Sequence, residues 1–374
     1  MKKTMLKMLT LCTLTTTLIA GCGSATSSSS DTTGGATESQ HQSLDMNSIL
    51  SQKPTGERIV LVTNNGSDGR DVWLQAKVKE AGFNAEIVAL GGGDITSRVI
   101  SEVSNPSLNV VWGPSDSMFT SMIEAGALEK WTPEWAADVE GASEENEFSW
   151  TYEIQPKLLI ANPDVYTADT VPTSYQDLWE KEEYHGKYAV PTSFGGTTDR
   201  AIIGGILGQY LDNNGELGVS QEGWDAIKQY FEYGYKTPQG ENDFQNMAKG
   251  TVPITYTFAS GLKGKIDNFK VTPLISYTTT GEPSNANQIG VIKSSNQAVL
   301  EESIRLANWL GSADVIGEYA SQYGSMVVNK QAVDKMTPLM QEIMKSFKAQ
   351  DLDWDYINSM MDQWAAKIQL EYMN

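Results

Sequence analysis

Short hydrophobic runs alternate with longer segments of mixed polarity from residue 58 onward. Three of these runs predict buried strands: RIVLVT (58–63), AEIVAL (85–90) and LNVVW (108–112). Each run leads through a small polar turn into a segment that predicts a helix, at 68–81, 95–103 and 117–125. Strand, turn and helix repeating in this order indicate an α/β architecture.

The three turns after these strands, at 64–67, 91–94 and 113–116, are small and polar, and each contains glycine. In open α/β sheets a ligand binds beyond the carboxyl ends of the strands, where such turns gather. The residues predicted to contact a ligand there are Asn65, Gly66, Ser67, Gly93, Asp94, Trp112, Ser115 and Asp116. The alternative is that the glycines only terminate strands and the aspartates only favour helix starts.

The second half of the chain continues the alternation after an extended segment at 149–160 (SWTYEIQPKLLI). Further extended segments are predicted at 186–191, 252–257, 271–277 and 289–293. Predicted helices occupy 172–179, which is a turn and a short helix, and 197–211, 221–233, 297–310, 313–323 and 338–347. With 374 residues, 40% of them hydrophobic, the chain is long enough for two domains with substantial cores.

One stretch, VPTSFGGTTDRAIIGG (190–205), places a hydrophobic run, a glycine-rich turn and a helix in succession. Glycines let a ligand approach the backbone, hydroxyls add donors and a helix start is partially positive, so the stretch predicts an anion site. Its candidate residues are Thr192, Ser193, Gly195, Gly196, Thr197 and Thr198. Ordinary helix capping is the alternative. The stretch is not a nucleotide-binding loop, because Asp199-Arg200 follows where Gly-Lys-Ser/Thr would be required.

The N-terminus has the features of a secretory signal, with lysines before a short apolar stretch at 8–19. LIAGC (18–22) then resembles a bacterial lipobox, so we expect residues 1–21 to be removed and Cys22 to carry lipid. Residues 22–46 contain almost no large apolar side chains and predict a flexible tether. The expected location is the outer face of the cytoplasmic membrane, which is the periplasmic side in a Gram-negative host.

Charge and composition exclude several classes of protein. The formal net charge is −20, and loss of the signal would make the mature protein more acidic still. A nucleic-acid partner is not expected, since phosphate contacts need clustered Lys and Arg. The chain beyond the tether contains no cysteine and a single histidine, His185. We therefore expect no enzyme, no catalytic residues, no cofactor and no metal site, because activated nucleophiles and His/Cys metal sites need those residues.

Four stretches together resemble the extracellular solute-binding proteins of ABC importers, in the ferric-ion and organophosphate-binding branch. They are 173–179 with 186–191 (TSYQDLW, GKYAVP), 109–113 with 123–128 (NVVWG, IEAGAL), 250–257, and 290–323. The resemblance spans about 58–330 and implies a two-lobed, type II periplasmic-binding-protein-like α/β fold. Each lobe is expected to hold a central, mostly parallel sheet flanked by helices. The expected division is 47–153 plus about 278–330 for lobe 1, 154–277 for lobe 2, and 331–374 for C-terminal helices that pack on the lobes.

The resemblance also implies hinge strands between the lobes. The hinge candidates are 152–155 and 256–260, with 276–279 as a third crossing. Tyr256 is a further ligand candidate, because it is predicted on the strand that returns across the cleft. A core or hinge aromatic is the alternative for Tyr256.

The function implied by the resemblance is capture of a solute between two lobes and its delivery to an ABC permease with its ATPase. The chain is expected to act as a monomer, held at the membrane by the lipid on Cys22. The hydroxyl- and glycine-rich turn favours a small anionic solute that carries phosphate, phosphonate or carboxylate.

Three alternatives stay open. Ferric members of the family typically use a histidine after the first strand and two adjacent tyrosines, whereas this chain has Asn64-Asn65-Gly66-Ser67 and Tyr256-Thr257 there. Iron held with a synergistic anion, or as a chelate, is the first alternative. A polyamine- or thiamine-type cation is the second, held by Asp68, Asp94, Asp116 or Asp199 against Trp112 or Tyr256. A surface adhesin or receptor on the same fold is the third.

Overall fold

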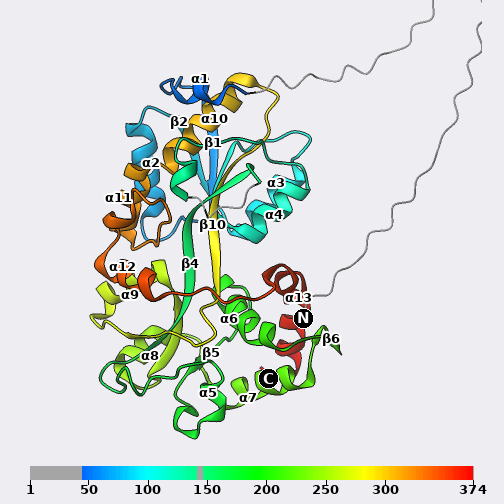
Figure 1. Ribbon diagram of the computed structural model, residues 1–374, viewed down its shortest axis with the longest axis vertical. Coiled ribbons are helices and arrows are strands. Elements are labelled where there is room, and N and C mark those ends of the chain that lie inside the picture. Colours follow the sequence, from blue (N-terminus) through cyan, green and yellow to red (C-terminus); the bar gives the residue numbers. More distant parts are fainter. Residues whose placement is uncertain (1–43, 140, 142–145, 374) are drawn as a thin grey trace, which may run out of the picture. The chain divides into compact units, whose positions relative to one another are not determined.

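The computed structural model describes residues 44–139, 141 and 146–373 (Figure 1). The predicted signal (1–21) and Cys22 lie outside the described residues. The predicted tether (22–46) reaches into them, and its last part differs from the prediction. Leu44 and Met46 pack against the central hydrophobic core, and Asp45 caps helix α1 (Met46–Leu50). The end of the predicted tether is therefore ordered by burial of its two large apolar side chains. Within the described residues, no helix is both long enough and apolar enough to cross a membrane.

Lobe 1 is built on the parallel strands β2 (Asn84–Ala89), β1 (Arg58–Thr63) and β3 (Val110–Ser115), in that order. Alternate residues of β1 face opposite sides, so both faces of the sheet are covered. Leu61 packs with α2 (Arg70–Glu80), α10 (Gln297–Leu310) and α11 (Ala313–Tyr323) in what we call the central core. Val62 packs with α3 (Gly92–Ser101) and α4 (Asp116–Glu124) on the other face.

Two long strands, β4 (Ser149–Ala161) and β10 (Ser284–Val291), connect this sheet to lobe 2. β10 lies antiparallel between β3 and β4, and β4 continues past it. From Lys157 onward β4 pairs instead with β8 (Ile254–Phe258), and from Leu159 also with β9 (Leu274–Ser276). One seven-stranded sheet therefore runs through both lobes.

Lobe 2 packs helices on both sides of the continuation of β4. Leu159 and Ala161 face the lobe 2 core with α5 (Asp177–Glu180), α6 (Thr197–Leu207) and α7 (Gln221–Tyr233). Leu158 and Ile160 face the central core, where α8 (Asp243–Lys249) and α9 (Ala259–Phe269) contribute. The described elements of the lobe also include the parallel pair β5 (Ala189–Val190) and β7 (Tyr235–Lys236) and the hairpin strand β6 (Leu211–Glu216).

The α/β fold with two lobes agrees with the sequence prediction, but the pairing in lobe 2 is more mixed than the mostly parallel sheet expected there. β8 and β9 are antiparallel to β4 because β4 enters lobe 2 as a through-going strand. The hinge candidate 152–155 lies within β4, which passes between the lobes. The other two do not cross: 256–260 joins β8 to α9, and 276–279 follows β9. β10 makes the return crossing instead.

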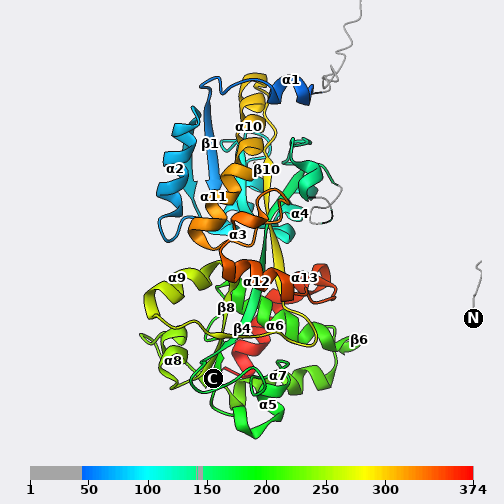
Figure 2. The same ribbon diagram turned by 60° about the vertical axis from the view of Figure 1, so that its left-hand side comes forward.

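The C-terminal segment crosses once more. α12 (Pro338–Ser346) places Met340 and Ile343 in the central core. The last helix, α13 (Trp354–Glu371), places Ile357 and Trp364 in the lobe 2 core and lies beside α6, as Figure 2 shows. Within that helix pair, a Cβ on Gly204 of α6 would stand 2.8 Å from the Cγ2 of Ile357. The absence of a side chain at Gly204 therefore sets how closely α13 approaches.

Replacing Gly204 by leucine should lower the free energy of unfolding by about 1–3 kcal/mol, the usual cost of overpacking a tight core. Urea denaturation of the purified protein measures this. Gly93→Leu is the matched control: Gly93 also lies in a helix, but a Cβ there meets no atom within 4 Å. That control should be neutral or slightly stabilising, since leucine is the better helix former. Equal effects of the two substitutions would contradict close packing of α6 against α13.

Candidate ligand-binding cleft

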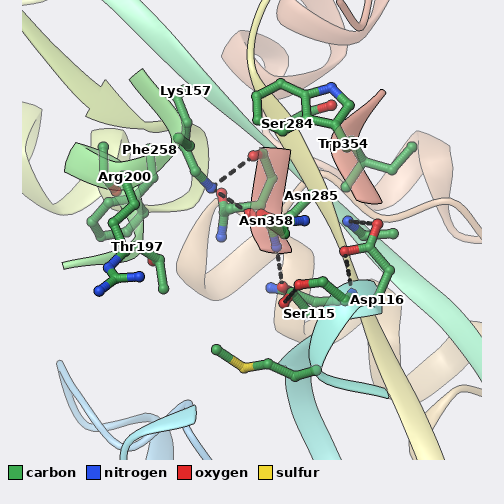
Figure 3. A pocket seen from close by; sticks show the side chains of 18 of the residues that line it. Ser115, Asp116, Lys157, Thr197, Arg200, Phe258, Ser284, Asn285, Trp354 and Asn358 are labelled. Carbon is green, nitrogen blue, oxygen red and sulfur yellow. Dashed lines mark hydrogen bonds between the residues drawn. The ribbon is translucent and has the colours of Figure 1, made fainter. Parts of the chain in front are cut away.

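A cavity of about 760 Å³ lies between the lobes (Figure 3). Lobe 1 contributes the turn after β1 and the start of α4, and the crossing strands contribute β4 and β10. Lobe 2 contributes the starts of α6 and α9, and the C-terminal segment contributes α13. Figure 3 shows residues from these elements around one space: Ser115, Asp116, Lys157, Thr197, Arg200, Trp354 and Asn358.

Three of the four turns that the sequence predicted at a site reach this cavity, namely 64–67, 113–116 and the glycine turn before α6. Of the predicted site residues, those that line it are Asn65, Ser67, Ser115, Asp116, Gly196, Thr197 and Thr198. The turn after β1 and the glycine turn before α6 come from different lobes, so the structure brings them together across the cleft.

The remaining candidates lie outside the lining in the described structure: Gly66, Gly93, Asp94, Trp112, Thr192, Ser193, Gly195 and Tyr256. Trp112 is 1% exposed, because its position on β3 faces the central core, where its ring lies 5.4 Å from that of Tyr152. Gly66 is needed for packing, since a Cβ there would stand 2.7 Å from the Cβ of Ala89. Gly93 and Asp94 belong to the first turn of α3, away from the cavity lining.

Tyr256 acts one layer behind the lining. Its hydroxyl donates a hydrogen bond of 2.6 Å to Oδ1 of Asp199, a cavity residue in the first turn of α6. Burial raises the pKa of the Asp199 carboxyl, while this hydrogen bond opposes the rise. Tyr256 therefore holds the start of α6 in place.

Lys157 is the cationic residue that the sequence reading missed. It lines the cavity from β4 and is only 2% exposed. Its Nζ donates to the backbone oxygen of Gln155 at 2.9 Å and to Oδ1 of Asn285 at 2.6 Å. Burial lowers the pKa of Lys157 to about 7, although Glu153 and Asp116 act in the opposite direction.

A chain of hydrogen bonds connects Lys157 to a buried acid. Asn285 donates from Nδ2 to Oδ1 of Asn287 at 2.7 Å, and Asn287 donates to Oε2 of Glu153 at 2.9 Å. Ser325 donates to the other carboxylate oxygen of Glu153. Burial raises the pKa of the Glu153 carboxyl, which these hydrogen bonds partly offset. The lysine is thus held by amides of β10, with the compensating charge displaced into the protein.

Arg70 connects α2 to lobe 2 at the edge of the cavity. The side chain is 6% exposed, and its guanidinium pairs with Asp68 at 2.9 Å. It also donates to the backbone oxygen of Ser260, at the start of α9, at 3.3 Å. The Arg70 Cζ lies 4.9 Å from the ring centroid of Tyr323. Asp68 is consequently committed to Arg70 rather than available for a cationic ligand.

Three helix N-termini point positive ends toward the cavity. The lining includes the first residues of α4 and α6 and Ser260 of α9. In the described structure, the residues that cap these helices, Ser115, Gly196 and Phe258, make no side-chain capping hydrogen bond. The amides of Ser117 and Ser260 donate to the side chains of Asp116 and Gln155, so it is the helix dipoles that favour an anion at such positions.

Two of the three carboxylates of the lining, Asp116 and Asp199, are already hydrogen-bonded by the protein. Asp116 accepts from the backbone nitrogens of Ser117 at 2.9 Å and Ala286 at 3.3 Å. Asp199 accepts from Tyr256. Across the described residues, no group of three His, Cys, Asp or Glu side chains is arranged to hold a metal ion. The cleft therefore offers donors and positive potential more than a carboxylate cage.

One missed feature left a signal in the sequence. Lys157 is a charged residue inside the hydrophobic run SWTYEIQPKLLI, and a lysine in a buried strand needs a reason. The asparagines of β10 and the cavity residues of α13 left none, because their roles arise only when distant segments meet.

Comparisons with known proteins support the fold and the class. A scan against protein-family models finds no match. A relative from Sinorhizobium fredii, named as a probable ABC transporter periplasmic-binding protein, is 29% identical over 303 residues, covering 81% of this chain and 83% of its own. Such a relative is a binding protein rather than an enzyme, in agreement with the expectation from the sequence.

Solved structures share the fold at low identity. Apo ferric ion-binding protein A of Pasteurella haemolytica matches with a TM-score of 0.67 at 15% identity, covering 85% of this chain and 98% of its own. Iron-bound HitA of Pseudomonas aeruginosa matches with a TM-score of 0.66 at 15% identity, covering 82% of this chain and 98% of its own. A Trichodesmium protein in complex with iron and citrate matches with a TM-score of 0.64 at 13% identity, covering 84% of this chain and 99% of its own. The chain therefore has the two-lobed fold of type II periplasmic-binding proteins, and it is related in sequence to a probable ABC transporter periplasmic-binding protein.

Proposed function

We propose that this protein captures a small organic anion, bearing phosphate, phosphonate or carboxylate, and delivers it to an ABC permease. The observation that carries the proposal is Lys157, a buried lysine that lines the cleft and whose Nζ donates to a backbone carbonyl and to an asparagine amide oxygen. Removing a charge from water is costly, and a bound anion would offset that cost.

The surroundings of Lys157 also favour a negatively charged ligand. The helix dipoles at the starts of α4, α6 and α9 add positive potential from both lobes. The net charge of −20 does not oppose this, because it is spread over the whole chain, whereas the ligand meets local dipoles. A cavity of about 760 Å³ also suits an organic solute, since ligand pockets typically measure about 300–1,000 Å³.

Capture would work by bridging. A ligand that contacts the turn after β1 in lobe 1 and the start of α6 in lobe 2 stabilises the arrangement in which the two lie close. Domain closure about a few connecting segments is the usual motion of two-lobed binding proteins. The crossing strands β4 and β10 are the segments about which we propose that it occurs.

Ferric iron is the second candidate. Three of the structural neighbours are named for ferric binding or for bound iron, and one holds iron together with citrate. The described residues offer no three-membered cluster of His, Cys, Asp and Glu, and Tyr256 is engaged with Asp199. Iron would therefore enter this cleft as a complex with an anion, which Lys157 would again recognise.

Anions should stabilise the protein, and Lys157→Met should weaken their binding about 10- to 150-fold, the worth of a hydrogen bond to a charged group. Thermal unfolding of the purified protein with methylphosphonate, phosphate, acetate, ferric citrate, ferric chloride, spermidine and thiamine measures this. A ligand at 100 times its Kd adds about 2.7 kcal/mol. Stabilisation by ferric salts alone, or by the two organic cations alone, would contradict the proposal. Lys249→Met, at the end of α8 and outside the lining, is the control.

Anion affinity should fall as the pH rises above 7. The free protein holds Lys157 with a pKa of about 7, and a bound anion favours the charged ammonium, so its pKa rises on binding. Binding above pH 7 must then take up a proton, and each pH unit costs up to about tenfold in affinity. Titration calorimetry with methanesulfonate, whose own charge is constant, measures this between pH 6 and 9. Lys157→Met should give a flat profile; an equally sloped profile in that variant would assign the effect elsewhere.

We propose that Cys22 is the lipidated residue that anchors the protein beside the permease. Bacterial lipobox cleavage leaves this cysteine as the first residue, and the chain that follows it is rich in Ser, Thr and Gly. Cys22→Ser should abolish incorporation of labelled fatty acid and move the protein from the membrane fraction to the soluble fraction. Cys12→Ser, within the signal, is the matched control and should change neither. Label retained in Cys22→Ser would refute the anchor.

A further inference from the structure

The last helix of the chain forms one wall of the cleft. Trp354, Asn358 and Met361 of α13 all line the cavity, and their spacing of four and three residues puts them on one helical face. Ala349 and Gln350, just before the helix, extend the same wall. In the sequence this segment carries no recognisable site motif.

This wall is fixed to lobe 2. On the adjoining face of the helix, Ile357 and Trp364 are buried in the lobe 2 core, and Met361 also packs into that core. A Cβ on Gly204 of α6 would stand 3.1 Å from the Cε of Met361 and 3.2 Å from the Cζ3 of Trp354. Asp362 pairs with Arg200, in the first turn of α6, at 2.6 Å. α13 and the proposed anion-binding turn therefore move as one body.

The chemistry of the wall differs from that of the rest of the cleft. The positive groups come from β4, α2 and three helix starts, whereas α13 presents an indole, an amide and a thioether. The charged residue that α13 adds to the lining, Asp355, is negative. Phe258 of β8 adds a second aromatic ring to the cavity. Such a wall binds a flat or hydrocarbon group well and repels a second anionic group.

The size of the cavity leaves room for that group. A water molecule takes about 30 Å³ of liquid volume, so a space of about 760 Å³ far exceeds what an inorganic anion fills. A ligand whose anionic end meets Lys157 would have its remaining atoms within a cavity that α13 bounds.

We infer that α13 is the specificity-determining wall of the cleft, and that the natural ligand is an organic molecule with one anionic end and an aromatic or hydrocarbon body. The inference rests on the proposed anion-binding function. Lys157 and the helix starts bind the anionic end of the ligand, while Trp354, Asn358 and Met361 contact its body.

The test compares ligands that share a head group and differ in the body. Methylphosphonate and phenylphosphonate, acetate and benzoate, and methanesulfonate and benzenesulfonate form three such pairs for titration with the purified protein. The wild type should bind the phenyl member of at least one pair tenfold or more tightly than the methyl member. Trp354→Ala should remove most of that preference, with Tyr356→Ala, on the same helix but outside the lining, as its control.

A second variant guards against a folding defect in Trp354→Ala. Asn358 is exposed and lines the cavity, whereas Gln363 is exposed on the same helix and does not. Asn358→Trp should fill the space beside the wall and weaken the phenyl ligand at least tenfold, while the methyl ligand changes less than twofold. Gln363→Trp should change neither.

The outcomes separate the two proposals. Binding of both members with equal affinity, or equal weakening of both by Asn358→Trp, would overturn the role of α13 and leave the anion site intact. Failure of every anion to bind would overturn the proposed function, and the role of α13 with it.

Discussion

The hydrogen bond from Lys157 to Asn285 joins β4 to β10 close to where both strands pass between the lobes. Its importance lies in the cost that it must offset, since an ammonium group removed from water loses several kcal/mol of hydration. The protein meets part of that cost with a backbone carbonyl and an amide, and part with Glu153 at the far end of an asparagine chain. Asp116 also favours the charged form of the lysine from the cavity wall. The crossing strands thus connect the lobes and also present an incompletely satisfied cation.

Local electrostatics and overall charge have separate roles here. A strongly acidic surface keeps a protein soluble and dispersed, whereas the cleft gathers backbone amides whose dipoles do not appear in any count of charged residues. Asp116 and Asp199, which line the cavity, are hydrogen-bonded to protein groups, which limits their capacity to attract a cation. Composition therefore argued against nucleic acid as a partner but did not indicate the sign of the ligand's charge.

Sequence periodicity predicted the elements of lobe 1 and helices α7, α10 and α11 well, because each has one face buried against a sheet. The glycine turn before α6 was also predicted, since its residue types have a direct mechanical meaning. Predictions failed for residues whose surroundings depend on which distant segments pack against them. Trp112 was placed at the cleft because it follows a strand, but the pleat turns it into the core. Lys157, the β10 asparagines and the α13 wall depend on contacts between segments far apart in sequence, which no local pattern encodes.

The position of α13 has a consequence for biogenesis. The core of lobe 2 begins with β4 and α5, yet it includes Ile357, Trp364 and Ile368 from the final helix. A chain that emerges N-terminus first can assemble much of lobe 1 early, but lobe 2 lacks part of its interior until the C-terminal residues arrive. Until then α6 and α7 lack the apolar side chains of α13 that cover them in the folded protein. Completion of the ligand cleft is thereby deferred until the whole polypeptide has been released.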